Sequence, residues 1–358
     1  MLKEVVIKNF RGIKYCKLSD LSTINVLIGP NNSGKSTILD AIYFGLKGVF
    51  DPHHLRNIVV NRVGRDIDLP EIFYAYNTEF PIEITLTFHG NYWYKLSIYK
   101  TKEPIILTTI GGVRSRVSPG SVVLTFKHSK ENLEFLYGVL GTRAEIVSGY
   151  TPASNRIKDS SVLTYARDSK LLLSHVKLNE LWKELDSLLS KFKLRRELEK
   201  KIVDSLKEIY GIKGYEYVPL PIRISEKKPT LLEGDLRVYG EFHGAGVQRT
   251  TLILAHLIAF KNTALLIEEI ETWQHPKSLK RLINYVVKYA LENSVQLFIT
   301  THSYYDCLRF LQDSVKEEFR EKVLRVYSIS KEPSGEVKAE NVTNNIQRII
   351  ESVYEMGY

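Results

Sequence analysis

The sequence is poor in cysteine and in long apolar stretches. Its 358 residues include two cysteines, Cys16 and Cys307, which show no paired spacing. This argues against a disulfide-stabilised scaffold and against a zinc site built from cysteine pairs. No segment approaches 18 uninterrupted apolar residues, and charges interrupt the apolar residues at the N-terminus, so neither a membrane span nor a signal peptide is expected. We therefore expect a cytoplasmic protein that does not contact a membrane.

Charge of one sign is not in large excess either. The chain has 50 Lys and Arg residues against 41 Asp and Glu residues, which gives a formal net charge of +9. An excess of this size permits a nucleic-acid or acidic partner without requiring one, and a mildly basic enzyme fits equally well. The apolar fraction of 44% is ample for a globular core.

A phosphate-binding loop is present near the N-terminus. Residues 29–36 read GPNNSGKS, which fits G-x-x-x-x-G-K-[ST], and they lie between an apolar run at 24–28 and a helix-like pattern. In such a loop, backbone N–H groups converge on nucleotide phosphates, Lys35 neutralises the β- and γ-phosphates, and the Ser36 hydroxyl ligates Mg²⁺. This context favours a real nucleotide site over a chance glycine loop. The predicted nucleotide-binding residues are Gly29, Asn31, Asn32, Ser33, Gly34, Lys35, Ser36 and, at the α-phosphate, Thr37.

Two acids and a histidine follow apolar runs in the second half of the chain. TALLIEE ends in Glu268 and Glu269, and VQLFITTHS leads to His302. Strands of this kind deliver side chains to the carboxyl edge of a sheet. Because alternation directs the two acids to different sides, we assign Glu268 to the Mg²⁺ shell and Glu269 as the general base for the attacking water. His302 would be structural if it stood alone, but beside these acids it is a candidate catalytic residue.

The sequence between the loop and the acids changes pattern twice. Five runs with partial alternation predict an antiparallel β-lobe at 80–150, namely PIEITLTF, NYWYKLSIYK, PIILTTI, SVVLTFK and EFLYGVL. Residues 160–215 predict a helical insertion. Its apolar stripe consists of Leu171, Leu178, Leu181, Leu185, Leu188 and Leu189. The basic run KFKLRRELEKK at 191–201 is most simply a solvated helix face, and a contact with nucleic acid or a protein is the alternative.

A glycine-rich turn at residue 240 leads into an apolar helix that extends to residue 260. A helix start with small residues before it can approach a phosphate closely, although it can also be only a tight turn. We expect one composite domain, 1–358. Its parts are a phosphate-loop segment at 1–50, the β-lobe at 80–150, the helical insertion at 160–215 and a final segment at 235–358.

Together these motifs resemble an ABC-class ATPase of the branch that includes the SMC, RecF and OLD (overcoming lysogenization defect) family ATPases. IKNFRGIKY, with Asn9 and Arg11, resembles the opening motif of that branch, whose Arg approaches the nucleotide phosphates. LIEEIETWQHP resembles the Walker B motif, and ITTHS resembles the strand of the switch His, which implies that His302 senses the γ-phosphate. GAGVQR resembles the signature that reaches the γ-phosphate across a dimer, which implies a role in trans for Ala245, Gly246 and Gln248.

Three residues depart from the common pattern of that branch. Glu268 stands where many relatives have Asp, Ile270 where Pro is common, and Ala245 in the place of a Ser, which removes one hydroxyl contact and implies slow hydrolysis. The glutamine that usually follows the first lobe is not identifiable. The 56 residues after His302 predict a closing strand, VLRVYSISK, and a closing helix, NNIQRIIESVYEMGY, in place of the Toprim nuclease domain of OLD nucleases.

The resemblance implies an α/β fold, an ABC-ATPase-like P-loop head with a mainly parallel core sheet, an antiparallel β-lobe and an inserted helical lobe. It also implies Mg²⁺-dependent ATP binding and hydrolysis in a homodimer, because a signature directed away from its own phosphate loop needs a second chain. Duplex DNA is the first expected partner, in repair, chromosome handling or defence. The alternative is a regulatory ATPase that controls a separate nuclease or toxin protein without binding DNA. A small-molecule kinase would leave the signature and the switch His unexplained.

Overall fold

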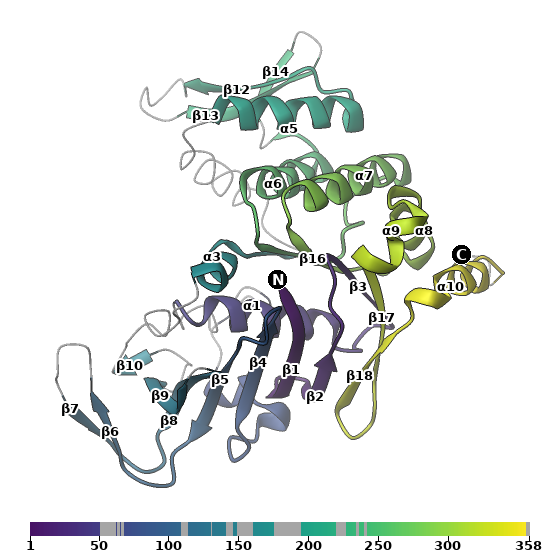
Figure 1. Cartoon of the computed structure of the whole chain (residues 1–358). Coiled ribbons are helices and arrows are strands. Elements are labelled where there is room, and N and C mark those ends of the chain that lie inside the picture. The colour runs from purple at the N-terminus through teal and green to yellow at the C-terminus, as the bar shows by residue number, and fades with distance from the viewer. Residues whose placement is uncertain are drawn as a thin grey trace.

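The described part of the chain forms one large mixed sheet with helices on both faces (Figure 1). The structure is a computed structural model, and it describes residues 1–50, Arg62, Arg65, 68–108, 114–129, 131–140, 146–148, 160–174, 195–219, 227–233, 236–239 and 242–355. Within these residues, 13 strands are hydrogen-bonded in the order β10-β9-β8-β5-β4-β1-β2-β18-β17-β3-β16-β15-β11. Strands from the N-terminal and the C-terminal parts of the chain thus belong to one sheet.

The end of the sheet that carries the phosphate loop is parallel. Strand β3 (Ile24–Ile28) pairs in parallel with β16 (Gln296–Thr300) and β17 (Leu324–Lys331). Beyond β16 follow β15 (Ala264–Ile267) and β11 (Lys170–Leu172), also in parallel. Every residue of β3 is buried, because helices cover both faces of a parallel sheet, and this explains its nearly unbroken apolar sequence. The predicted parallel core around the loop is confirmed.

The β-lobe continues the same sheet in antiparallel order. Strand β1 (Leu2–Phe10) pairs with β2 (Ile13–Leu18) on one side and with β4 (Ile82–Phe88) on the other. Every second residue of β4 is buried, as the period-2 pattern predicts. The lobe then extends through β5 (Trp93–Lys100), β8 (Val122–His128), β9 (Glu131–Leu140) and β10 (Ile146–Ser148). The predicted antiparallel lobe is confirmed, and its strands make the sheet as a whole mostly antiparallel.

One run of the predicted lobe lies outside this sheet. PIILTTI contributes β6 (Ile105–Thr108), which pairs with β7 (Arg114–Val117) in a separate hairpin at the lower left of Figure 1. Strand β5 pairs directly with β8, and the Thr101 N–H donates to the Ser121 carbonyl at 2.8 Å where the two strands meet. Because this hydrogen bond brings the end of β5 next to the start of β8, the residues that lie between these two strands in the sequence are excluded from the sheet. PIILTTI therefore forms a strand, but this strand is not part of the predicted β-lobe's sheet.

Helices cover the two faces of the parallel core. Helix α1 (Lys35–Lys47) packs on one face, and α6 (Ala245–Ala259), α7 (Pro276–Glu292) and α8 (Tyr304–Ser314) pack on the other. Within β3, Leu27 belongs to the apolar cluster on the α1 face, whereas its neighbours Val26 and Ile28 belong to the cluster on the α6 face. The alternation of side chains along β3 thus divides the core into two layers.

The helical insertion contains strands that the sequence pattern did not predict. Helices α3 (Ser160–Asp168) and α5 (Arg195–Tyr210) confirm its helical character. Leu171, however, lies in β11 and not on a helical stripe, because pairing with the exposed edge of β15 outweighs the local helical spacing. The other stripe positions, 178–189, lie outside the described residues. A small antiparallel sheet follows α5 (Figure 1), formed by β12 (Gly214–Pro219), β13 (Lys227–Glu233) and β14 (Leu236–Tyr239).

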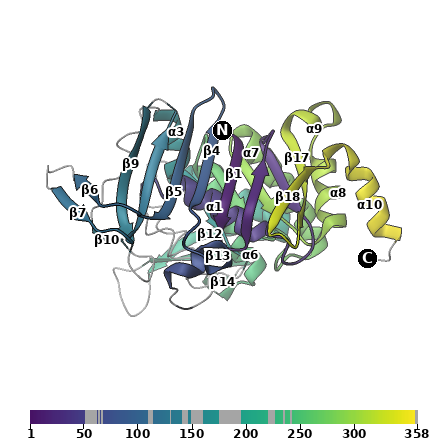
Figure 2. The same ribbon diagram turned by 90° about the horizontal axis from the view of Figure 1, so that it is seen from below.

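The C-terminal part of the chain joins the two halves of the sheet. Strand β18 (Glu336–Asn341) pairs with β17 in antiparallel and with β2 in parallel orientation. The predicted closing strand and helix are confirmed as β17 and α10 (Ile346–Glu355), while β18 was not predicted. Figure 2 places α10 and the β6–β7 hairpin at opposite ends of the molecule. The other short helices among the described residues are α9 (Glu317–Val323) and the 3₁₀ turns at Leu69–Ile72, Tyr74–Tyr76 and Thr343–Asn345.

None of the described helices is long and apolar enough to cross a membrane.

A buried glutamine connects the first strand to the parallel core. Gln296 has no exposed surface, and its Oε1 accepts the Leu2 N–H at 2.8 Å and the hydroxyl of Tyr165. Its Nε2 donates to the carbonyls of Leu2 at 2.9 Å and Ser22 at 2.8 Å. Every hydrogen-bonding position of the amide is therefore used, which makes its burial tolerable.

Candidate functional site

The phosphate loop joins β3 to α1 through glycine conformations. Gly29 has a φ of 144°, and a Cβ there would lie 2.2 Å from the carbonyl oxygen of Ile329, so only glycine fits. Gly34 has a φ of 104° immediately before the first turn of α1. The loop therefore ends at a helix N-terminus, where backbone N–H groups favour an anion. Exposed or half-buried positions are occupied by Asn31, Asn32, Ser36 and Thr37.

Lys35 is turned back onto this loop. Its Nζ donates to the carbonyl oxygens of Gly29 at 2.6 Å and Pro30 at 2.9 Å. Burial lowers the pKa of Lys35, and the negative charges of Glu269 and Glu271 oppose that shift. The Lys35 amine therefore donates to backbone carbonyl oxygens, and phosphate oxygens of a bound nucleotide would take the place of these acceptors.

The two residues predicted to hold Mg²⁺ lie close together. The Ser36 side chain is near enough to the Glu268 carboxylate to help lower its pKa, and Glu268 is 2% exposed. The Glu268 carboxylate also accepts the Ser174 N–H at 3.1 Å, and Arg62 Nη1 donates to it at 2.7 Å. Burial alone would raise the pKa of Glu268, but the Arg62 charge, the nearby Ser36 side chain and the hydrogen bond from Ser174 outweigh it, so the pKa is lowered. The ionised carboxylate is a hard oxygen ligand of the kind that Mg²⁺ prefers.

The sequence interpretation missed a buried network of two acids and two arginines. Asp40 in α1 is fully buried and forms ion pairs with Arg11, in the turn between β1 and β2, and with Arg62. Arg62 Nη2 donates to Asp40 Oδ1 at 2.7 Å, and the same guanidinium reaches Glu268. Burial raises the pKa of Asp40, and the two guanidinium groups oppose this rise. The available signal was Asp40 itself, a charge inside the apolar pattern of α1.

The predicted general base and the switch histidine lie together. Glu269 Oε1 is 3.4 Å from His302 Nε2, and both side chains are partly exposed. The Glu269 N–H donates to Thr300 Oγ1 at 2.9 Å, and the Thr272 hydroxyl donates to the Glu269 carboxylate at 3.2 Å. Glu269 has a φ of 46°, a left-handed conformation that is uncommon outside glycine and recurs at functional sites. The adjacent acids Glu268 and Glu269 therefore occupy different surroundings, one buried and one open.

A third acid of the same loop, Glu271, was not predicted. Its Oε1 accepts the N–H of His302 at 2.6 Å and that of Ser303 at 3.3 Å. Tyr304 begins α8 immediately afterwards, and its hydroxyl accepts the N–H of Gly29 at 3.0 Å. The signal in the sequence was its place in EEIE, three residues after Glu268. The start of α8 therefore contacts both the acid-bearing loop and the phosphate loop.

The signature segment forms the start of α6. Ala245 and Gly246 lie in its first turn, and a Cβ on Gly246 would be 2.3 Å from the carbonyl oxygen of Trp273. Gln248 Nε2 donates to the carbonyl of His243 at 2.6 Å. A hollow of about 620 Å³ opens beside this turn. Because α6 and α1 cover opposite faces of the sheet, the signature and the phosphate loop of one chain belong to different layers.

Arg249 connects the signature helix to the acid-bearing loop of its own chain. Its Nη1 donates to the carbonyls of Leu173 at 3.2 Å and Ser174 at 3.1 Å, and its Nη2 donates to those of Glu268 and Glu269. Burial lowers the pKa of Arg249 to about 10, and the nearby glutamates oppose this shift. The guanidinium therefore holds the ends of β11 and β15 against α6.

Asn9 is placed in a different contact from the other predicted residues. Its Nδ2 donates to the carbonyl of Pro81 at 2.9 Å, just before β4. Its φ of 54° and the φ of 51° of Arg11 give the turn after β1 an unusual backbone, which directs Arg11 to α1. A contact between Asn9 and the nucleotide stays a prediction.

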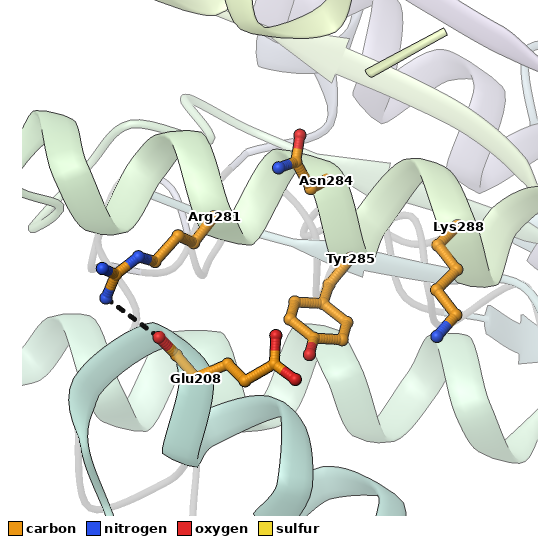
Figure 3. Close-up of a pocket in the computed structure, with 5 residues that line it drawn as sticks. All are labelled: Glu208, Arg281, Asn284, Tyr285 and Lys288. Atoms are coloured by element: carbon orange, nitrogen blue, oxygen red, sulfur yellow. Dashed lines mark hydrogen bonds between the residues drawn. The ribbon is translucent and has the colours of Figure 1, made fainter. Parts of the chain in front are cut away.

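A second hollow lies between α5 and α7, away from these residues. The hollow has a volume of about 510 Å³ and is lined by Glu208 of α5 and by Arg281, Asn284, Tyr285 and Lys288 of α7. Figure 3 shows the side chains of Arg281, Tyr285 and Lys288 extending from α7 toward α5. Arg281 Nη1 donates to the Glu208 carbonyl at 2.9 Å, so this cation is already engaged. Its described lining contains no residue of the predicted nucleotide site.

The residues at the loop fit a nucleotide with its Mg²⁺. The Ser33 hydroxyl is buried and has no hydrogen-bond partner among the described residues, which a phosphate oxygen would satisfy. Lys35 supplies a cation, and Ser36 and Glu268 supply a neutral and an anionic oxygen close to each other. This donor set suits an octahedral ion that also binds phosphate oxygens.

Comparisons with known proteins agree with this geometry. A family model described as an AAA ATPase domain matches residues 1–166 and 148–305. The chain is 23% identical over 343 residues to an ATP/GTP phosphatase of Helicobacter pylori, with 89% of each chain covered. It is 22% identical over 333 residues to an OLD nuclease of Thermus scotoductus, which covers 85% of this chain and 59% of the nuclease.

Among solved structures, the crystal structure of an SmcHead bound to the C-winged helix domain of ScpA has a similar fold. The TM-score is 0.54 at 12% identity, and 95% of this chain and 97% of that chain are covered. Since the family model spans most of the chain and the relatives align along its length, the chain belongs to the AAA ATPase domain family, within the ABC-class branch of P-loop ATPases that includes the SMC, RecF and OLD proteins.

Proposed function

We propose that this protein binds ATP with Mg²⁺ and hydrolyses it to ADP and phosphate. The observation that carries the proposal is that the phosphate loop, the neighbouring Ser36 and Glu268, and the Glu269–His302 pair lie together at one edge of the parallel core. Lys35 neutralises the β- and γ-phosphates, and Glu269 accepts the proton of the attacking water. His302 contacts the γ-phosphate. Mg²⁺, held by Ser36 and Glu268, supplies electrostatic stabilisation of the phosphates when it is bound.

The ATP-bound form is a homodimer in this proposal. The signature turn at Ala245 and Gly246 starts a helix on the sheet face opposite α1, and a hollow of about 620 Å³ opens beside it. A second copy of the chain would bring its γ-phosphate to this turn, with Gln248 in the following turn. Nucleotide binding would thereby act as a dimerisation switch, since ATP is shared by two surfaces and ADP is not.

Duplex DNA is the proposed partner of the dimer. The exposed basic residues of α5 and the place of the chain in a branch that includes RecF and SMC proteins support this choice. A protein partner, such as a separate nuclease or toxin, is the outcome to expect if the ATP-loaded dimer retains a co-purified protein and no duplex.

The decisive experiment uses Glu269→Gln. The amide cannot accept the proton of water, so hydrolysis should fall by about two to four orders of magnitude while ATP binding persists. The variant should accumulate as a dimer in ATP and Mg²⁺, measured by light scattering after size exclusion.

Lys35→Ala serves as the binding control. It removes the charge opposite two phosphates, and a fluorescent ATP analogue should no longer bind. Undiminished binding by Lys35→Ala would place the nucleotide elsewhere. Full loss of hydrolysis in Glu268→Gln with retained metal binding, and none in Glu269→Gln, would exchange the roles of the two acids.

A further inference from the structure

Glu271 lies where the acid-bearing loop meets the start of α8. Its Oε1 accepts the N–H groups of His302 at 2.6 Å and Ser303 at 3.3 Å. These are the last residues before a helix, whose free N–H groups favour a carboxylate. The contact therefore fixes the backbone from which the His302 side chain extends.

The same helix start is fixed to the phosphate loop by a different contact. The Tyr304 hydroxyl accepts the Gly29 N–H at 3.0 Å, independently of Glu271. The imidazole of His302 lies 3.4 Å from Glu269. Loss of the Glu271 contact would thus free His302 while the attachment of α8 to the phosphate loop remains.

The second oxygen of the Glu271 carboxylate is buried and has no hydrogen-bond partner among the described residues. A buried acceptor without a donor costs free energy, and a helix cap by itself would not require one. The charge of Glu271 acts on Lys35, Arg249 and Tyr304, so the carboxylate lies within the charged surroundings of the nucleotide site. These features distinguish it from an ordinary cap at the protein surface.

We propose that Glu271 is a positioning residue for ATP hydrolysis, which holds the backbone of His302 so that its imidazole stays beside Glu269. This inference rests on the function proposed above. The Glu271 side chain is long enough for one carboxylate oxygen to accept hydrogen bonds from two N–H groups, and this is how it acts. It does not contact the nucleotide.

Two substitutions separate the effect of the length of the Glu271 side chain from the effect of its charge. Glu271→Gln keeps an acceptor oxygen at the same distance and removes the charge, whereas Glu271→Asp keeps the charge and withdraws the carboxylate by one methylene. We expect kcat to stay within about threefold of the wild type for Glu271→Gln and to fall about tenfold or more for Glu271→Asp. Affinity for a fluorescent ATP analogue should stay unchanged in Glu271→Asp, because this variant keeps the charge near Lys35 and the Tyr304–Gly29 contact remains.

A double-mutant cycle with His302→Ala tests whether Glu271 acts through the histidine. The double variant with Glu271→Asp should be no slower than His302→Ala alone, because the histidine is then no longer there to be positioned. Asp306→Ala is the matched control, since Asp306 lies in the first turn of α8 and contacts the Ser303 hydroxyl at 3.4 Å but not the N–H of His302. It should leave kcat unchanged.

A kcat that falls more in Glu271→Gln than in Glu271→Asp would overturn the proposal, because the charge of the side chain would then matter more than its length. Additive losses with His302→Ala would overturn it as well. Failure of the proposed function is separately visible, since the wild-type protein would then not hydrolyse ATP at all.

Discussion

At the scale of single residues, the distance to neighbouring backbone atoms decides which glycines of the motifs can be replaced by a residue with a Cβ. Gly29 and Gly246 both lie so near a carbonyl oxygen that a Cβ would come within 2.2 Å and 2.3 Å of it. The obstacle is backbone in both cases, which cannot rotate away as a side chain can. Gly244, two residues before Gly246 in the same motif, faces open space, because a Cβ added there would have nothing within 4 Å.

We therefore expect Gly246→Ala to lower the free energy of unfolding by about 1–3 kcal/mol, because α6 must move away from the Trp273 loop. Gly244→Ala should leave stability unchanged or slightly raised, since it adds no overlap and reduces the freedom of the unfolded chain. Urea denaturation of both variants measures the difference. Equal stability of the two variants would mean that α6 can shift without cost.

At the scale of elements, the site depends on charges that bridge α1 and the loop after β15. Arg62 contacts Asp40 of α1 and Glu268, and its side chain is 9% exposed. Arg65, three residues later, forms a pair of hydrogen bonds with Glu71 at 3.1 and 2.8 Å, but its side chain is 60% exposed. Water screens the second pair and not the first.

Arg62→Gln should therefore destabilise the protein by about 3–5 kcal/mol, because it leaves two buried carboxylates without a shared cation. Arg65→Gln should change stability little, since its pair is exposed. Chemical denaturation without nucleotide is the appropriate measurement, because bound ligand would add its own stabilisation. A small effect of Arg62→Gln, similar to that of Arg65→Gln, would show that the buried network contributes little.

The sequence predicted those elements whose local residue pattern matches their surroundings in the fold. The strands β3, β15 and β16 are apolar and buried, and the glycine-rich loop follows β3 directly, so their place in the site could be predicted. Leu171 could not, because its local helical spacing is outweighed by pairing of β11 with a distant strand. Asp40, Arg62 and Glu271 also escaped prediction, since their partners lie far away in the sequence and no spacing rule connects them.

At the scale of the whole molecule, the first two turns of α5 carry four basic residues of the predicted basic run. Arg196, Lys200 and Lys201 are exposed on that helix, and Arg195 is its first residue. Lys191 and Lys193 of the same basic run lie outside the described residues. Two chains of net charge +9 would come together in a dimer, and contacts with phosphate would release counterions.

If the ATP-bound dimer binds duplex DNA, the logarithm of its affinity should fall about linearly with the logarithm of salt concentration, with little dependence on sequence. Charge reversal at Arg195 and Arg196 should weaken binding and flatten the slope by about one to two units. The control is charge reversal at Lys316 and Lys322, which are exposed beside and within α9 and change the net charge equally. No duplex binding at low salt, with or without ATP, would exclude DNA and favour a protein partner; equal losses in both double variants would exclude α5 as the contact.

The amide of Gln296 has a consequence for the order in which the chain folds. It joins Leu2 to a residue 294 positions later, so β1 can complete its hydrogen bonds only after almost the whole chain has left the ribosome. At roughly 5–20 residues per second, the interval between the two partners is about 15–60 seconds. The β1–β2 hairpin and its pairing with β4 involve nearer partners and should form first, whereas the parallel strands that carry the acids and the histidine must wait. The antiparallel half should therefore act as a template for the parallel half, and during that interval the unpaired edge of the nascent sheet is a binding surface for chaperones.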